Sequence, residues 1–294
     1  MNGTATAADD TLPITAEPLT IPAGDGVECA ALLYRSAEAA ASHPPLVLHL
    51  HGGAFVSAPP DGVPCVVRLL HSAGAAVVSL RYPLAPQWPF PHAAEAAHAA
   101  LVHLHKRRRA LAGAQSRLFV AGEEAGGNLA AAASLMARDR AGPPLDGQIL
   151  FSPMLDVCVG TASLRQAKAG PVGCRWADGW HDYLPDPNAA LHPYATPGAA
   201  ARLSGLPSTL LVTAADDAFR DETAAYARRL REAGVPIGQL MLQAPTRLPA
   251  PYMEPAPRCD PEWAAIARAR VRRFLFDPDP QAIHNSTMPS RSLP

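Results

Sequence analysis

The sequence predicts an α/β fold, a mostly parallel β-sheet with helices on both faces. Apolar runs of strand length, such as residues 46–50 and 75–80, alternate along the chain with longer segments of helical composition. Uninterrupted apolar strands are typical of parallel sheets that are covered on both faces. The chain has 294 residues, of which 48% are hydrophobic and 17% charged, and this composition can bury a sizeable core.

Each expected element follows from a local pattern. Residues 26–34 form a plausible strand, and Pro44 and Pro45 introduce the apolar strand over 46–50. A helix over 91–112 carries a basic run near its end, where cations favour the helix dipole. A helix is expected to end near Gly234, because glycine often closes helices. The further expected elements are strands over 117–122, 147–151, 209–214 and 237–242, and helices over 125–139, 221–234 and 261–276.

The chain is expected to hold one domain over residues 26–276. Residues 1–25 read as a loose N-terminal segment, and residues 277–294 as a disordered tail that contains proline and serine. The stretch of about 159–206 is rich in Gly, Pro, Trp and His and breaks the alternation of strands and helices. We therefore expect it to be a cap inserted over the sheet.

Composition excludes several classes of protein. The net charge of −1 argues against a nucleic-acid partner, which requires a surplus of cations. No apolar run reaches the ~18 residues of a membrane span. Five widely spaced cysteines predict neither a disulfide framework nor a zinc site, and residues 1–13 lack the pattern of a signal peptide. We expect a cytoplasmic protein without a metal or cofactor; His98, His103 and His105 lack the spacing of a metal site.

Several motifs in order resemble one family. Residues 51–55 read HGGAF, and residues 82–91 read YPLAPQWPFP, which is close to Y-R-L-A-P-E-x-P-F-P. Residues 122–130 read GEEAGGNLA, which is close to G-D-S-A-G-G-N-L-A. Ser152-Pro153 and residues 217–221 (DAFRD) match two further blocks. Together they resemble the α/β-hydrolases of the hormone-sensitive-lipase-type carboxylesterase family, over roughly residues 20–276.

The resemblance implies an ester-cleaving site. Such a site uses a nucleophilic hydroxyl at a sharp strand-to-helix turn, a histidine base and a carboxylate that orients it. Backbone N–H groups stabilise the oxyanion, and the matching positions here are Gly52, Gly53 and Ala125. Ala54 stands where the family often has a third glycine.

Two of the three catalytic positions depart from the family pattern. Glu124 occupies the position of the nucleophilic serine at the elbow. Asp217 matches the acid position, so the resemblance places the histidine near residue 247. That region contains no histidine, and His284 is the only histidine after Asp217. The triad is therefore degenerate. The alternative explanation of Asp217 is structural: it caps the next helix or pairs with a cation.

Two hypotheses concern the charges at this site. The amides at a helix N-terminus favour an anion, so the Glu124 carboxylate is expected to fold into the oxyanion hole as an internal plug. Arg247, near the position of the absent histidine, is expected to pair with Glu124 or Asp217.

Other residues have both a site reading and a structural one. His51, Phe55, Glu123 and Arg247 are possible pocket residues, while His49 reads more simply as a core histidine. Four aromatic residues could line a pocket or form the core of the cap: Trp88, Trp176, Trp180 and Tyr183.

The favoured functional interpretation is an esterase-like protein that has lost ester hydrolysis. It would keep a pocket for a small hydrophobic ligand, an ester or an acid, or bind a protein partner; a homodimer is possible. One alternative is an active carboxylic ester hydrolase that uses residues at unexpected positions. Another is a non-hydrolytic enzyme in which Glu124 serves as general base for elimination, cyclisation or hydration.

Overall fold

A computed structural model describes residues 14–23, 28–35, 43–59, 61–167, 171–253 and 262–277. It confirms the α/β class. One eight-stranded sheet has the order β1-β2-β4-β3-β5-β6-β7-β8. Its strands are β1 (Glu17–Pro22), β2 (Glu28–Tyr34), β3 (Leu46–Leu50), β4 (Ala76–Leu80), β5 (Leu118–Glu123), β6 (Gly147–Phe151), β7 (Thr209–Ala214) and β8 (Ile237–Leu242).

The pairing pattern explains the composition of the strands. Neighbouring strands in the order β4-β3-β5-β6-β7-β8 pair in parallel. At the other edge of the sheet, β1 pairs with β2 and β2 pairs with β4 in the antiparallel sense. Every residue of β3, β4, β5, β6 and β7 is buried. These strands are buried on both faces, which accounts for their mainly apolar sequences.

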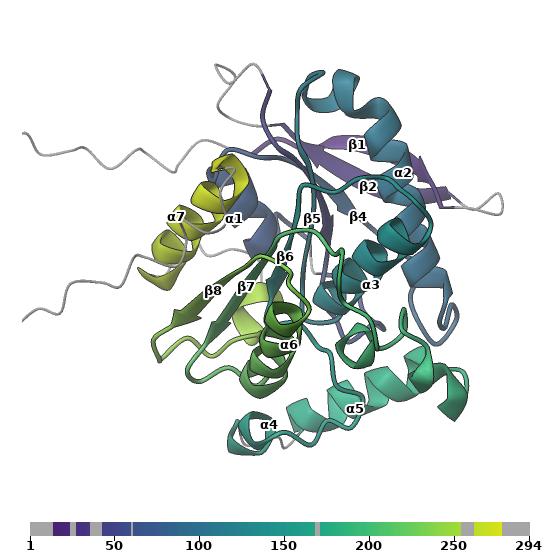
Figure 1. Cartoon of the computed structure of the whole chain (residues 1–294), viewed down its shortest axis with the longest axis vertical. Coiled ribbons are helices and arrows are strands. Elements are labelled where there is room, and N and C mark those ends of the chain that lie inside the picture. Colours follow the sequence, from purple (N-terminus) through teal and green to yellow (C-terminus); the bar gives the residue numbers. More distant parts are fainter. Residues whose placement is uncertain are drawn as a thin grey trace, which may run out of the picture.

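Helices cover the two faces of the sheet (Figure 1). On one face, α2 (His92–Ala112), α3 (Ala125–Asp139) and α6 (Arg220–Glu232) contribute to the larger hydrophobic cluster. On the other face, α1 (Cys65–Ser72) and α7 (Glu262–Phe276) contribute to the second cluster and contact each other. No helix within the described ranges is long and apolar enough to cross a membrane.

The segment between β6 and β7 holds the elements of the expected cap. They are α4 (Ala162–Gln166), α5 (Pro171–Tyr183) and the 3-10 turns Pro187–Leu191 and Pro197–Ala199. Figure 1 shows α4 and α5 along the bottom of the view, below α6, and α4 contacts α6. A further 3-10 turn, Ala250–Met253, follows β8.

One expectation about the N-terminal segment is wrong. Residues 17–22 are not loose but form β1, which pairs along its whole length with β2. Only Ile21 of this strand is fully buried, so its apolar pattern is too weak to be seen in the sequence. The backbone pairing with β2 holds it at the edge of the sheet. Residues 1–13 lie outside the described residues, as do residues 278–294 of the tail expected over 277–294.

The close packing of α3 against β3 requires a residue without a side chain at position 126. A Cβ atom at Gly126 would meet the backbone carbonyls of Leu50 and His51. We predict that Gly126→Ala lowers the free energy of unfolding by about 1–3 kcal/mol or more, because overpacking forces the backbone to shift. Urea unfolding measures this change. Gly160→Ala is the matched control, since among the described residues its Cβ would have one neighbour, the Cys158 carbonyl oxygen 3.5 Å away. Equal losses in the two variants would contradict the close packing.

Candidate active site

The elbow is a sharp turn between β5 and α3. Glu124 has φ 53° and ψ −118°, a backbone conformation that side-chain-bearing residues rarely adopt. Gly122 and Gly126 make it possible, because a Cβ at Gly122 would collide with the Gly126 carbonyl. The turn is fixed by hydrogen bonds from Glu124 N to Phe151 O (3.1 Å) and from Met154 N to Glu124 O (3.0 Å). The structure thus presents residue 124 in the manner expected of an elbow nucleophile.

The Glu124 side chain turns back onto the loop after β3. Gly53 N–H and Ala54 N–H both donate to Oε2, the second at 2.9 Å. The indole Nε1–H of Trp176, on the cap helix α5, donates to Oε1 at 2.5 Å. Glu124 is only 1% exposed, so these donors take the place of water around the carboxylate.

The backbone amides that bind the Glu124 carboxylate differ in part from those expected to bind an oxyanion. Gly53 donates to Glu124 as expected, and the second donor is Ala54. Gly52 N–H instead donates to Oε1 of Glu123 at 3.2 Å. No hydrogen bond within the described part of the chain joins Ala125 N–H to the Glu124 carboxylate, although Ala125 begins α3 beside it.

His51 supports this loop from beneath. Its Nδ1 lies 2.7 Å from the Gly52 carbonyl and must donate to it, while its ring stacks on Tyr82 at 4.2 Å between centroids. The Tyr82 hydroxyl donates to the His51 carbonyl at 2.7 Å. Burial lowers the pKa of His51 to about 3, so the imidazole is neutral at pH 7.

Phe55 and the aromatic residues of α5 join the loop to the cap. Phe55 stacks on Tyr183 with ring centroids 3.9 Å apart, and lies 5.0 Å from the Trp180 ring. Phe55, Trp180 and Tyr183 are all buried, whereas Trp88 is 38% exposed and contacts His92. The buried aromatic residues thus form the contact between cap and loop, and Trp88 is not part of it.

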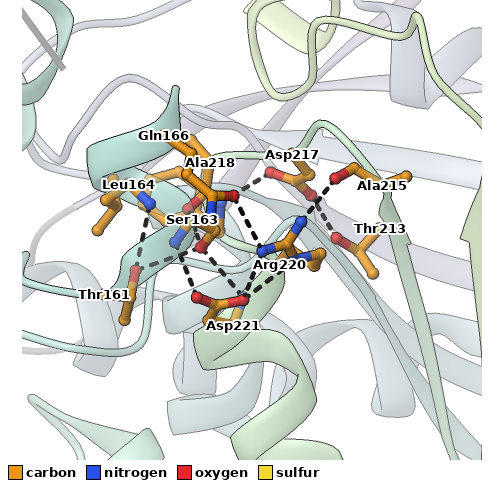
Figure 2. A network of polar contacts seen from close by, with 11 residues as sticks. Thr161, Ser163, Leu164, Gln166, Thr213, Ala215, Asp217, Ala218, Arg220 and Asp221 are labelled. Atoms are coloured by element: carbon orange, nitrogen blue, oxygen red, sulfur yellow. Dashed lines mark hydrogen bonds and ion pairs between the residues drawn. The ribbon is translucent and has the colours of Figure 1, made fainter. Parts of the chain in front are cut away.

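Asp217 is held by hydroxyls rather than by an imidazole. Its Oδ2 accepts hydrogen bonds from Ser152 Oγ and Thr213 Oγ1, each at 2.5 Å, and its Oδ1 accepts one from Phe219 N at 2.9 Å. Burial raises the pKa of this carboxyl. Figure 2 shows Asp217 beside the Arg220–Asp221 ion pair, with Asp221 and Ser163 linking α6 to α4. Asp217 thus holds the turn before α6 through the Phe219 N–H. The two structural explanations are corrected: its side chain does not cap α6, and no ion pair among the described residues includes it.

Arg247 does not join the site. Its side chain is exposed, and its backbone N–H donates to Oδ2 of Asp216 at 3.0 Å. No ion pair within the described residues links it to Glu124 or Asp217. The expected pairing is therefore corrected: the proline-bearing loop after β8 binds Asp216 through its backbone and directs the arginine to the surface.

Sequence reasoning missed one group of polar residues near the elbow. His49 Nε2 lies 2.8 Å from Oε2 of Glu123, and His49 Nδ1 lies 2.9 Å from Ser79 Oγ. The imidazole of His49 thus lies between a carboxylate and a hydroxyl. The sequence signal that could have found this group is a single polar residue inside each of two apolar strands, His49 in β3 and Ser79 in β4.

Comparisons with known proteins agree with this geometry. A family model described as an alpha/beta hydrolase fold matches residues 47–243. The crystal structure of EstE1, a thermophilic carboxylesterase from a metagenomic library, superposes with a TM-score of 0.77 and 31% identity, covering 90% of both chains. The hyperthermophilic esterase of Pyrobaculum calidifontis gives a TM-score of 0.75 at 29% identity, covering 93% of this chain and 88% of that one.

Sequence relatives point the same way. Esterase LipI of Mycobacterium tuberculosis is 36% identical over 203 residues, which is 66% of this chain and 62% of LipI. The arylesterase of Saccharolobus solfataricus is 33% identical over 195 residues, covering 65% of this chain and 63% of that protein. The matched part thus spans less than two thirds of the length of these relatives. The protein is an α/β-hydrolase in its fold and its elbow, and the chain belongs to the hormone-sensitive-lipase-type carboxylesterase family.

The contact between Glu124 and Trp176 can be tested by a double-mutant cycle. Glu124→Gln replaces one acceptor oxygen with an NH₂ group, which must face either Trp176 Nε1–H or the loop amides. We predict a loss of about 1–3 kcal/mol in the free energy of unfolding, because a buried donor loses its acceptor. Trp176→Phe removes one of the competing donors, so the double variant should lose less than the sum of the single losses. Urea unfolding measures all the variants, and strict additivity would contradict this contact.

The buried His51 makes stability depend on pH. Its folded pKa of about 3 lies below the ordinary 6.5, so the unfolded chain takes up the proton first as the pH falls. The free energy of unfolding should then fall by about 1.4 kcal/mol per pH unit below pH 6.5, until the folded pKa is reached. His51→Asn keeps a donor for Gly52 and does not titrate, so its stability relative to the unaltered protein should rise between pH 7 and pH 4. Parallel pH slopes in urea unfolding would contradict the neutral, buried imidazole.

Proposed function

We propose that this chain is a member of the carboxylesterase family that binds without hydrolysing esters. The observation that carries the proposal is the Glu124 carboxylate on the amides of Gly53 and Ala54. In an esterase of this fold, backbone amides after this strand receive the oxyanion of the substrate. Here an oxygen of the protein itself takes that place, in the manner of a bound carboxylate product.

The contacts of Asp217 and His51 also support the loss of ester hydrolysis. Asp217 accepts its hydrogen bonds from Ser152, Thr213 and the backbone of Phe219. His51 is neutral and is bound to the Gly52 carbonyl. A serine hydrolase needs a hydroxyl, a base and an acid in mutual contact, and loss of one member of such a unit lowers its rate by orders of magnitude.

The alternative in which Glu124 acts as general base has less support. Such a base needs a carboxylate oxygen open to the substrate proton. Here Oε2 accepts two backbone N–H groups, Oε1 accepts the indole of Trp176, and the side chain is buried.

The position of the Glu124 carboxylate also limits the chemical class of ligand that this site can bind. A carboxylic acid seated at this turn would meet the Glu124 carboxylate, and two like charges at close range repel each other. A neutral ester or a protein partner is therefore favoured over a free acid. In this proposal the protein acts in the cytoplasm, and a ligand reaches the turn when Trp176 leaves it. The proposal makes no use of a metal or cofactor.

Turnover of p-nitrophenyl butyrate, followed by absorbance, tests the proposal. We expect no turnover above that of the same reagent in buffer, because no described histidine contacts residue 124 or Asp217. Glu124→Gln is the matched variant, since it keeps the size of the side chain. Turnover that disappears in Glu124→Gln would contradict the proposal, because Glu124 would then be catalytic. A melting temperature raised by a neutral short-chain ester and not by its free acid would support the ligand class.

A further inference from the structure

A serine, a histidine and a carboxylate stand in hydrogen-bonding order on the sheet, close to the elbow but without Glu124. Ser79 lies on β4, His49 on β3 and Glu123 at the end of β5. His49 and Ser79 are register partners across the parallel β3–β4 pair, so their side chains share one face. This is the face of Val47 and Val77, which pack in the cluster of α1 and α7.

The contacts fix the roles of the imidazole nitrogens. Glu123 Oε2 lies 2.8 Å from His49 Nε2, and Glu123 Oε1 accepts the Gly52 N–H at 3.2 Å. A carboxylate only accepts hydrogen bonds, so in the neutral form of His49 the proton is on Nε2. Its Nδ1 then faces the Ser79 hydroxyl, 2.9 Å away, as an acceptor. This is the arrangement in which a carboxylate orients an imidazole and the imidazole can take the proton of a serine.

Ser79, His49 and Glu123 differ in their exposure to solvent. His49 is 0% exposed and Glu123 1%, whereas Ser79 is 8% exposed. Of the three residues, Ser79 therefore lies nearest to solvent. The carboxylate end is closed by the loop that carries Gly52.

We propose that Ser79 is an activated hydroxyl and a site of covalent modification by small acylating agents. With p-nitrophenyl acetate, Ser79 Oγ bonds to the acetyl carbonyl carbon, and the bond from that carbon to the phenolic oxygen breaks. The p-nitrophenolate leaves with the electron pair, and the hydroxyl proton passes to His49 Nδ1. Glu123 stabilises the imidazolium through Nε2–H until His49 releases the proton to water. The proposal covers a single acylation, so it does not depend on whether the elbow hydrolyses esters.

The experiment is acetylation of the full chain with p-nitrophenyl acetate, followed by peptide mapping with mass spectrometry. Ser57 is an internal control in the same molecule: it is more exposed than Ser79, and its hydroxyl donates to the Gly53 carbonyl instead of contacting an imidazole. We expect acetyl occupancy at Ser79 to exceed that at Ser57 at least tenfold. Occupancy at Ser57 equal to or above that at Ser79, or no acetyl group at Ser79 with reagent in excess, would overturn the proposal.

Variants test the relay itself. Ser79→Ala should lose this acetyl group, and His49→Gln should slow acetylation of Ser79 by about 10²-fold or more, as expected for loss of a general base. Acetylation of His49→Gln at the rate of the unaltered protein would overturn the proposal. Where a variant does not fold, as judged by circular dichroism, the ratio of Ser79 to Ser57 in the unaltered protein decides. Butyrate turnover that persists in Ser79→Ala would count against the proposed function and leave the acylation result intact.

Discussion

The hydrogen bonds from the Gly53 and Ala54 amides to the Glu124 carboxylate organise this end of the molecule. They join the turn after β3 to the turn after β5. The second carboxyl oxygen adds α5 of the cap through Trp176. A buried carboxylate requires donors, and buried backbone amides require acceptors, so each group satisfies the other. The cap contact is reinforced by Phe55, which stacks on Tyr183.

The family scaffold remains intact around this changed centre. Gly122 and Gly126 still permit the close crossing of strand and helix, and residue 124 still has the strained φ of an elbow. Strain of this kind persists where the surroundings over-determine it. The fold therefore presents residue 124 as an esterase would present its nucleophile, while the side chain at that position is a carboxylate bound to backbone amides. This separation of fold from site explains how resemblance to esterases fits a proposal of binding without hydrolysis.

Much of the fold could be predicted from the sequence, because buried parallel strands carry mainly apolar runs. The bounds of α3, β3 and β6 agree with the expected ranges to the residue. The edge strand β1 was missed, since backbone pairing holds it and only Ile21 is fully buried. At the site, motif order located Glu124, Gly53 and Asp217. The partners of their side chains were less predictable: Arg247 lies in a loop whose backbone conformation points it to solvent. The contact of His49 with Ser79 depends on strand register, which motif matching does not use.

The most direct measurement of the central claim is the amide proton spectrum of the loop after β3. A short hydrogen bond to a carboxylate moves an amide proton to low field, and such charge-assisted bonds are the stronger ones. The account predicts that the Gly53 and Ala54 amide protons resonate at unusually low field in the unaltered protein and return toward ordinary positions in Glu124→Ala. The Gly52 amide, which donates to Glu123, should move less. Gly53 and Ala54 resonances that do not change in Glu124→Ala would show that the carboxylate does not occupy this turn, and would contradict the account.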